Sequence, residues 1–286
     1  MAADCVLPCD AGLISTERLA RLGWTRHRMT RAVALGRLTR VRRGLYRCPH
    51  ATSRVRAAAE AGARLTGLAA LAELGCWMWR EPTLSVAVPF SGTRTLRRPA
   101  TARVHWCGQR EMRRASLASV HLLDALRHTA LDEEHEDAVA AFDWAFCSGR
   151  LTLAQFEEVL ARLPQRLQSL REAIDPRCES FLESVARTRL RSAGHALQTQ
   201  VPIGPDWLLR RRQRVDLVVD AVVALELDGR EHHEQSFEAD RRKDLDAAIA
   251  GLVPLRVSYS MVEREWWLVE KAIAAARTRP AGGTHE

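Results

Sequence analysis

Residues 214–244 read RVDLVVDAVVALELDGREHHEQSFEADRRKD, and this stretch decides the fold of the C-terminal part of the chain. It contains two apolar runs of strand length, RVDLVV and AVVALELDG, and each run holds an acid, Asp216 in the first and Glu226 in the second. Carboxylates are almost never buried unless they are paired or hold a metal ion. The stretch therefore predicts two strands whose acids lie together to bind a ligand, and a divalent cation is the simplest such ligand.

The sequence on either side predicts the rest of a domain. Residues 177–194 have the apolar spacing of a helix that ends at Gly194, and LQTQVPI at 197–203 predicts a strand before RVDLVV. After the acids, 236–250 predict a helix, 252–260 a strand and 261–279 a closing helix. This order predicts an α+β or α/β domain over 171–280, a mixed sheet flanked by helices, with a disordered tail at 281–286.

The N-terminal segment has the element order of a winged helix-turn-helix. Ser15 or Thr16 can cap a first helix, Gly23 supplies a turn, and Thr25 caps a second helix. The apolar side chains expected to face the core from that second helix are Met29, Val33 and Leu35. LTRVRRGLYR at 38–47 alternates apolar and basic residues, as a two-stranded wing does. We therefore expect a winged helix-turn-helix at 1–50.

The same segment is strongly basic. Residues 12–47 contain ten arginines against the single acid Glu17, in a chain of 286 residues with a net charge of +8. An excess of this kind favours a polyanionic partner. On the winged-helix interpretation the residues placed against DNA are Arg26, Arg28, Arg31, Arg40, Arg42 and Arg43. The alternative is a solvated basic face on a protein-binding domain.

Other classes of protein are disfavoured by the remaining sequence. The seven cysteines are scattered, with Cys5 and Cys9 near the start and no CxxC spacing, so neither a zinc site nor a disulfide framework is expected. No run approaches the ~20 apolar residues of a membrane helix, and no signal peptide is recognisable. We expect a cytoplasmic protein without a membrane partner.

Residues 51–170 predict a connecting α+β domain, largely helical, with little chemistry of its own. Its most conspicuous feature is the acidic run 132–137. Because acids are favoured at the start of a helix, we expect this run to form the first turn of a helix rather than a metal site.

Six segments between residues 180 and 262 follow one another in a known order: SxxES at 180–184, QVPI at 200–203, RVDLVV at 214–219, LELDGREHH at 225–233, FEADRRKD at 237–244 and PLRVSYSMV at 254–262. Together they resemble the PD-(D/E)XK endonuclease-like superfamily, and within it the very-short-patch-repair (Vsr) type endonucleases and related actinobacterial proteins. The N-terminal segment resembles the winged helix of AbiEi-type antitoxins. The resemblance implies a restriction-endonuclease-like sheet and hydrolysis of DNA phosphodiester bonds.

Carried onto this sequence, the resemblance makes Asp216 and Glu226 the motif acids and Glu183 the acid of the preceding helix. Carboxylate oxygens suit Mg²⁺ or Mn²⁺, and such an ion activates water and neutralises phosphate charge. The sequence departs from the family where a lysine is usual, two residues after the glutamate, because Asp228 stands there. Asp228 is then a candidate fourth metal ligand.

The missing cation and the proton carriers have candidates further along the chain. Lys243, with Arg241 and Arg242 beside it, can supply the positive charge. His232 or His233 can act as general base or acid, since imidazole titrates near neutrality. The alternative for the two histidines is a solvated loop.

Three functions remain open from the sequence. The first is a metal-dependent DNA endonuclease targeted by the winged helix, in DNA repair or phage defence. The second is an antitoxin-like or regulatory DNA-binding protein whose nuclease fold has lost catalysis, which the missing lysine favours. The third is an interaction module that contacts RNA or a protein. DNA is the expected partner, with a homodimer and a toxin-antitoxin or defence-system partner as further candidates.

Overall fold

The computed structural model describes residues 7–91, 101–204, 213–229 and 237–278. The chain divides into two compact units, one formed by residues 1–134 and 153–168 and the other by residues 135–152 and 169–286. Each unit combines helices with one or more sheets, so the mixed α and β class expected from the sequence is confirmed. Among the described helices, none has both the length and the apolar composition needed to cross a membrane.

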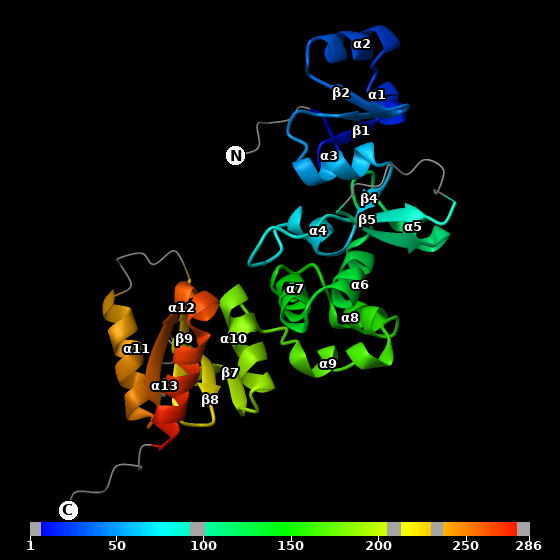
Figure 1. The fold of residues 1–286 in the computed structure, drawn as a ribbon. Coiled ribbons are helices and arrows are strands. Elements are labelled where there is room, and N and C mark those ends of the chain that lie inside the picture. The colour runs from blue at the N-terminus through cyan, green and yellow to red at the C-terminus, as the bar shows by residue number, and fades with distance from the viewer. Residues whose placement is uncertain (1–6, 92–100, 205–212, 230–236, 279–286) are drawn as a thin grey trace, which may run out of the picture. The chain divides into compact units, whose positions relative to one another are not determined.

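The first unit begins with a small antiparallel sheet and two helices (Figure 1). The strands lie in the order β1-β3-β2, and the elements are β1 (Leu13–Ser15), α1 (Thr16–Arg21), α2 (Arg26–Ala34), β2 (Thr39–Arg42) and β3 (Leu45–Arg47). Both predicted caps are present: Ser15 Oγ accepts from the backbone N of Arg18 at 3.1 Å, and Thr25 Oγ1 accepts from that of Arg28 at 3.2 Å. The strand β1, which pairs with β3, was not expected from the sequence.

The core face of α2 differs from the expectation. Met29 is buried as predicted, but Val33 is 38% and Leu35 58% exposed. The second buried position is Ala32, one turn from Met29 on the side that faces Leu19 of α1 in the core cluster. Leu35 lies after the end of the helix, where the helical spacing no longer applies.

The remainder of the first unit surrounds a three-stranded sheet of order β4-β5-β6, in which β4 is antiparallel and β6 parallel to β5. Its elements are α3 (Ser53–Glu60), β4 (Arg64–Leu65), α4 (Gly67–Ala72), β5 (Ser85–Pro89), β6 (Arg103–Cys107), α5 (Gln109–Arg114), α6 (Leu122–Asp132), α8 (Leu153–Leu160) and a 3-10 turn (Gln165–Leu167). Helix α6 packs against α4 and α8 and forms the apolar centre of this part.

The second unit is built on a four-stranded sheet of order β10-β9-β8-β7, in which β10 is parallel to β9 and the other pairs are antiparallel (Figure 1). The elements are α7 (His135–Cys147), α9 (Leu170–Ala173), α10 (Phe181–Ser192), β7 (Leu197–Ile203), β8 (Gln213–Val219), β9 (Val223–Asp228), α11 (Phe237–Ile249), β10 (Val253–Ser258), α12 (Tyr259–Arg264) and α13 (Trp266–Thr278). The parallel pair follows from the crossover through α11. The predicted order is confirmed, with the closing helix divided in two at Glu265.

Helix α7 belongs to the second unit, although the sequence placed it in the connecting domain. Its Asp143 is fully buried, forms an ion pair with Arg187 of α10, and accepts a hydrogen bond from Ser184 Oγ at 2.6 Å. The acidic run was predicted to form the first turn of one helix, but this holds only for its end: Glu136 and Asp137 lie in the first turn of α7, whereas Asp132 is the last residue of α6. The pairing of Asp143 with Arg187 joins residues 44 positions apart, which helical spacing alone does not reveal.

Candidate functional site

Asp216 of β8 and Glu226 of β9 lie just beyond one end of the antiparallel ladder between these two strands. The ladder runs from Val219↔Val223 to Leu217↔Leu225, and the next residue on each strand is one of the two acids. Asp216 Oδ2 accepts a hydrogen bond from the backbone N of Leu227 at 2.9 Å. The side chain of Asp216 thus binds the backbone N–H of the residue after Glu226. This hydrogen bond keeps the two acids near each other on adjacent strands.

Glu226 is buried, with 8% of its surface exposed, and its two oxygens differ in environment. Oε2 forms an ion pair with Nζ of Lys243 on α11, while Oε1 has no hydrogen-bond partner among the described residues. Burial, reinforced by the negative charge of Asp216, raises the pKa of Glu226 to about 7. Lys243 and Arg256 oppose this rise without cancelling it. A buried acceptor left unpaired costs about 1–3 kcal/mol, so this oxygen is suited to a ligand.

Glu183 of α10 lies within electrostatic reach of Asp216. Its Oε2 accepts hydrogen bonds from Gln200 Nε2 at 2.9 Å and from the backbone N of Glu179 at 3.1 Å. Burial raises the pKa of Glu183, and the charge of Asp216 raises it further. The pKa of Asp216 is also raised by burial, with the hydrogen bond from Leu227 and the charge of Lys243 acting against the rise. Three acids from α10, β8 and β9 therefore form one electrostatically coupled group.

Gln200 positions Glu183 at a cost to the backbone. It lies in β7 between the register pairs Thr199↔Leu217 and Val201↔Val215, with φ of 53°. A non-glycine residue in this left-handed region is strained by about 1–3 kcal/mol. Gln200 was recognised in the sequence as part of the QVPI segment, without a role. Its backbone conformation leaves no mark in the strand pattern, so the contact with Glu183 is visible in the structure alone.

Asp228, two residues after Glu226 on β9, faces a different cation. Its Oδ1 lies 3.7 Å from Nη1 of Arg256 on β10, and Nε of Arg256 binds Asp244 Oδ1 at 3.1 Å. Arg256 is also the register partner of Glu226 in the parallel ladder. Arg256 was not expected from the sequence, although a charged residue inside the apolar run LVPLRVSYS is the same signal that indicates Asp216.

Of the three cations offered by the sequence, Lys243 is the one that forms an ion pair with Glu226. His232 and His233 lie outside the described residues, as does the tail at 281–286. The buried core beside Lys243 includes Ala247 of the same helix with Val218 and Ala224 of the sheet, so α11 packs directly on the acid-bearing strands.

The acidic group suits a hard cation in its chemistry. Mg²⁺ is usually bound in proteins through one or two carboxylates and keeps several of its waters. Glu226 Oε1, which has no hydrogen-bond partner among the described residues, and the carboxylate of Asp216 are ligand types of this kind. The four candidate acids, Glu183, Asp216, Glu226 and Asp228, do not meet at one point. Within the described ranges, no three of these acids bring one oxygen each within 4.8 Å of one another.

A hollow of about 440 Å³ adjoins this group. It is lined by Phe146, Cys147, Pro176, Arg177, Cys178, Glu179, Gln200 and Arg214. Two of these side chains are arginines held by acids, Arg177 by Asp175 at 3.1 Å and Arg214 by Glu179 at 3.0 Å. The charges of both arginines in the hollow are thus balanced by neighbouring acids.

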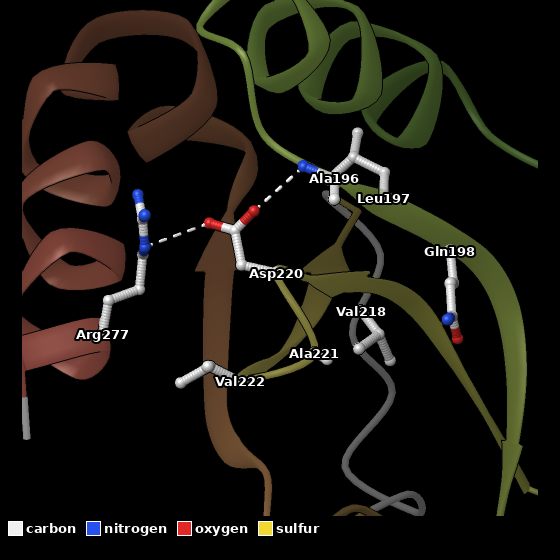
Figure 2. A pocket seen from close by; sticks show the side chains of 8 residues that line it. All are labelled: Ala196, Leu197, Gln198, Val218, Asp220, Ala221, Val222 and Arg277. Atoms are coloured by element: carbon white, nitrogen blue, oxygen red, sulfur yellow. Dashed lines mark hydrogen bonds and ion pairs between the residues drawn. The ribbon is translucent and has the colours of Figure 1, made fainter. Parts of the chain in front are cut away.

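A second hollow, of about 500 Å³, lies at the turn between β8 and β9 (Figure 2). Asp220 in this turn accepts from the backbone N of Ala196 at 2.9 Å, pairs with Arg277 at 3.3 Å and binds His195 Nδ1 at 2.7 Å (Figure 2 draws the first two). The bond from His195 is the main cause of the lowered pKa of Asp220. Because the chain itself satisfies both carboxylate oxygens, Asp220 closes the turn and offers no free ligand atom.

The six arginines assigned to DNA are all exposed, three on α2 and three on the β2–β3 hairpin. The guanidinium of Arg28 lies over the ring of Trp24, 4.3 Å from its centroid. Within the part of the chain that the structure describes, none of the six forms an ion pair with an acid. The helix and the hairpin therefore present uncompensated positive charge to solvent.

Comparison with protein-family models found no match, and comparison with curated proteins found none either.

Proposed function

We propose that this protein is a metal-dependent DNA endonuclease, with a phosphodiesterase site in the second unit and a winged helix-turn-helix in the first unit that binds DNA. One observation carries the proposal: Glu226 is buried beside Asp216 and Lys243, and one of its carboxylate oxygens has no hydrogen-bond partner among the described residues. The chain satisfies the carboxylates of Asp143 and Asp220. Asp124 in the first unit also has a buried oxygen without a partner among the described residues, but what distinguishes Glu226 is the second buried acid, Asp216, whose charge raises its pKa. A buried, incompletely satisfied acid among other acids is typical of a site that binds a ligand.

Asp216 and Glu226 would hold Mg²⁺ or Mn²⁺, with Glu183 within electrostatic reach. The ion when bound supplies a more acidic water and positive charge beside the phosphate. Glu183, whose pKa is raised and whose orientation Gln200 sets, is suited to accept a proton from a water molecule.

Lys243 takes the role that the missing motif lysine would have. Its ammonium reaches the acids from α11 rather than from β9, through the ion pair with Glu226. A lysine in this position stabilises negative charge on a phosphate oxygen during displacement.

The first unit supports DNA binding through its element order and its charge. Two short helices joined by a glycine turn, followed by a hairpin, are the arrangement in which a second helix enters the major groove and a wing contacts phosphates. Arg26, Arg28 and Arg31 lie on that second helix, and Arg40, Arg42 and Arg43 on the hairpin.

A cleavage assay on supercoiled plasmid tests the proposal. With Mg²⁺ or Mn²⁺ the protein should convert it to nicked or linear DNA, and Asp216→Asn, Glu226→Gln and Lys243→Met should each remove the activity. Asp220→Asn is the matched control, because Asp220 lies in the same sheet but is satisfied by the chain. Equal residual cleavage by the wild type and Asp216→Asn would identify a contaminant and contradict the proposal.

A catalytically inactive DNA-binding protein is the second candidate. It is favoured by the placement of the described acids, which do not gather three oxygens within 4.8 Å, and by Asp228 at the lysine position. Such a protein, with a regulatory or antitoxin-like role, would bind DNA without cleaving it, and Mg²⁺ would leave its Tm unchanged. A rise in Tm with Mn²⁺ that Glu226→Gln abolishes would instead favour the nuclease.

A further inference from the structure

Three soft-donor side chains meet in the first unit, apart from the acidic group and from the DNA-facing arginines. One ligand atom from each of Cys9, Cys48 and His50 lies within 4.8 Å of the others. Cys9 Sγ and His50 Nε2 are 3.2 Å apart, although 41 positions separate them in the sequence. Cys48 is fully buried, and the other two are partly buried.

The backbone brings these residues together through a tight contact. Cys48 follows β3 directly, and its N–H donates to the carbonyl of Gly12 at 2.8 Å. Gly12 has φ of 86°, and a Cβ there would lie 2.6 Å from Cα of Ala51. Only glycine allows so close an approach of the N-terminal segment to the turn at 48–51.

The segment that carries Cys9 is held from its other side as well. Asp10 Oδ2 accepts a hydrogen bond from the backbone N of Ala118 at 3.1 Å, and Asp10 N donates to the carbonyl of Leu13 at 2.8 Å. Cys9 packs against the apolar cluster that contains Ile14 and Cys48. The thiols are thus held at the edge of an apolar core.

We propose that Cys9, Cys48 and His50 form a zinc site. Two thiolates and a neutral imidazole are the ligands that Zn²⁺ prefers, whereas Mg²⁺ and Ca²⁺ prefer oxygen. Two thiolates also neutralise the ion, so the site adds no net charge at the edge of an apolar core. Within the described part of the chain no fourth His, Cys, Asp or Glu joins the cluster. Because Zn²⁺ is usually four-coordinate, one further ligand would complete the coordination of the ion.

The position of the site gives it a structural consequence. The ion would tie the segment around Cys9 to residues 48–50, immediately after the hairpin that carries Arg40, Arg42 and Arg43. Because metal affinity becomes folding free energy when the unfolded chain has no preformed site, zinc would stabilise this end of the first unit. The proposal does not depend on nuclease activity in the second unit.

Metal analysis of the full-length protein, purified in reducing buffer without chelators, tests the proposal directly. The wild type should carry one zinc ion per chain, and Cys9→Ser and His50→Ala should lose most of it. The matched control is Cys147→Ser, which alters an exposed cysteine of the second unit and should keep the zinc. Zinc content unchanged in both Cys9→Ser and His50→Ala would overturn the proposal.

Cobalt gives a readout that does not depend on the folding of any variant. Titration of metal-free wild type with Co²⁺ should produce thiolate-to-cobalt charge-transfer absorption and the visible bands of tetrahedral cobalt, and Zn²⁺ should displace them. Absence of the charge-transfer band would overturn the proposal. Peptide mapping that finds a Cys9–Cys48 disulfide in protein kept under reducing buffer would also overturn it, because a disulfide removes both thiolates.

Discussion

Lys243 of α11 forms an ion pair with Glu226 of β9, and so brings an ammonium group to the acids from a helix outside the sheet. Asp228, two residues after Glu226 on the same strand, has its Oδ1 3.7 Å from Nη1 of Arg256 on β10. Each of these two acids is therefore opposed by a cation from another element. Under the proposed function, Lys243 would take the part of the lysine that the nuclease motif carries two residues after its glutamate.

The raised pKa of Glu226 predicts that ionisation of this group lowers the stability of the fold. In the fold the group holds its proton up to about pH 7 against an ordinary pKa of 4.5, so stability is lost as the pH rises through this window. Glu226→Gln, which mimics the protonated form, should therefore stabilise the protein at pH 8 by about 3 kcal/mol, since each pKa unit is worth about 1.4 kcal/mol. Urea unfolding at pH 8 and pH 4 measures the difference.

The same comparison carries its own control. At pH 4.5 and below, Glu226→Gln and the wild type should have nearly equal stability, because both are then uncharged at this position. An equal gain at both pH values would show that the effect is one of packing and not of ionisation, and the assignment of a raised pKa would fail.

The strained backbone of Gln200 and its hydrogen bond to Glu183 can be tested separately, the first by stability and the second by activity. Glycine adopts φ near 53° without strain, so Gln200→Gly should keep the Tm at or slightly above that of the wild type, while the loss of the bond to Glu183 lowers cleavage. Gln200→Ala, which keeps the strain and loses the bond, should lower both. A Gln200→Gly variant with full cleavage activity would exclude a positioning role for the amide.

The local order of elements was predictable because it rests on short-range chemistry. The caps at Ser15 and Thr25 and the alternation in RVDLVV are written within a few neighbouring residues, and they predicted the helices and strands that the structure has. The strand β1 and the exposure of Leu35 were not predictable in this way. Both depend on how a small core closes around α1 and β3.

The partners within the candidate site depend on tertiary approach. An acid inside an apolar strand marks Asp216 and Glu226 as unusual, and the same rule applied to LVPLRVSYS would have found Arg256. No local pattern selects Lys243 over Arg242, nor brings Cys9 to His50, because these pairs are joined by helix packing and by the contact at Gly12.

Gly12 predicts a specific loss of stability in the first unit. Gly12→Ala combines a left-handed backbone with a Cβ 2.6 Å from Ala51, so it should lower stability by more than the ~1–2 kcal/mol that the backbone alone costs. Gly36→Ala is the matched control, with φ of 69° and nothing within 4 Å of the new Cβ. Thermal unfolding of both should show the larger loss for Gly12→Ala, and equal losses would remove the close approach as the cause.

The basic surface predicts the salt dependence of DNA binding. If Arg28 and Arg31 contact phosphates, Arg28→Ala and Arg31→Ala should each weaken binding and reduce the slope of log affinity against log salt by about 0.9. Fluorescence anisotropy with a labelled duplex over a salt series measures both quantities. Arg80→Ala, an exposed arginine elsewhere in the first unit, should leave the slope unchanged. An unchanged slope in all three variants would place the DNA contacts outside α2.

The buried pair Asp143–Arg187 predicts an asymmetric response to mutation. Asp143→Ala leaves a guanidinium that cannot lose its proton inside the unit, and should cost about 3–5 kcal/mol at any pH near neutrality. Arg187→Met leaves a carboxyl whose pKa burial already raises, so Asp143 can take up a proton, and the loss should be smaller at pH 5 than at pH 8. Urea unfolding of both variants at the two pH values tests this, and a pH-independent loss in Arg187→Met would mean that Asp143 stays charged. Because the pair joins α7 to α10, a large loss in Asp143→Ala would also establish that α7 is part of the second unit in solution.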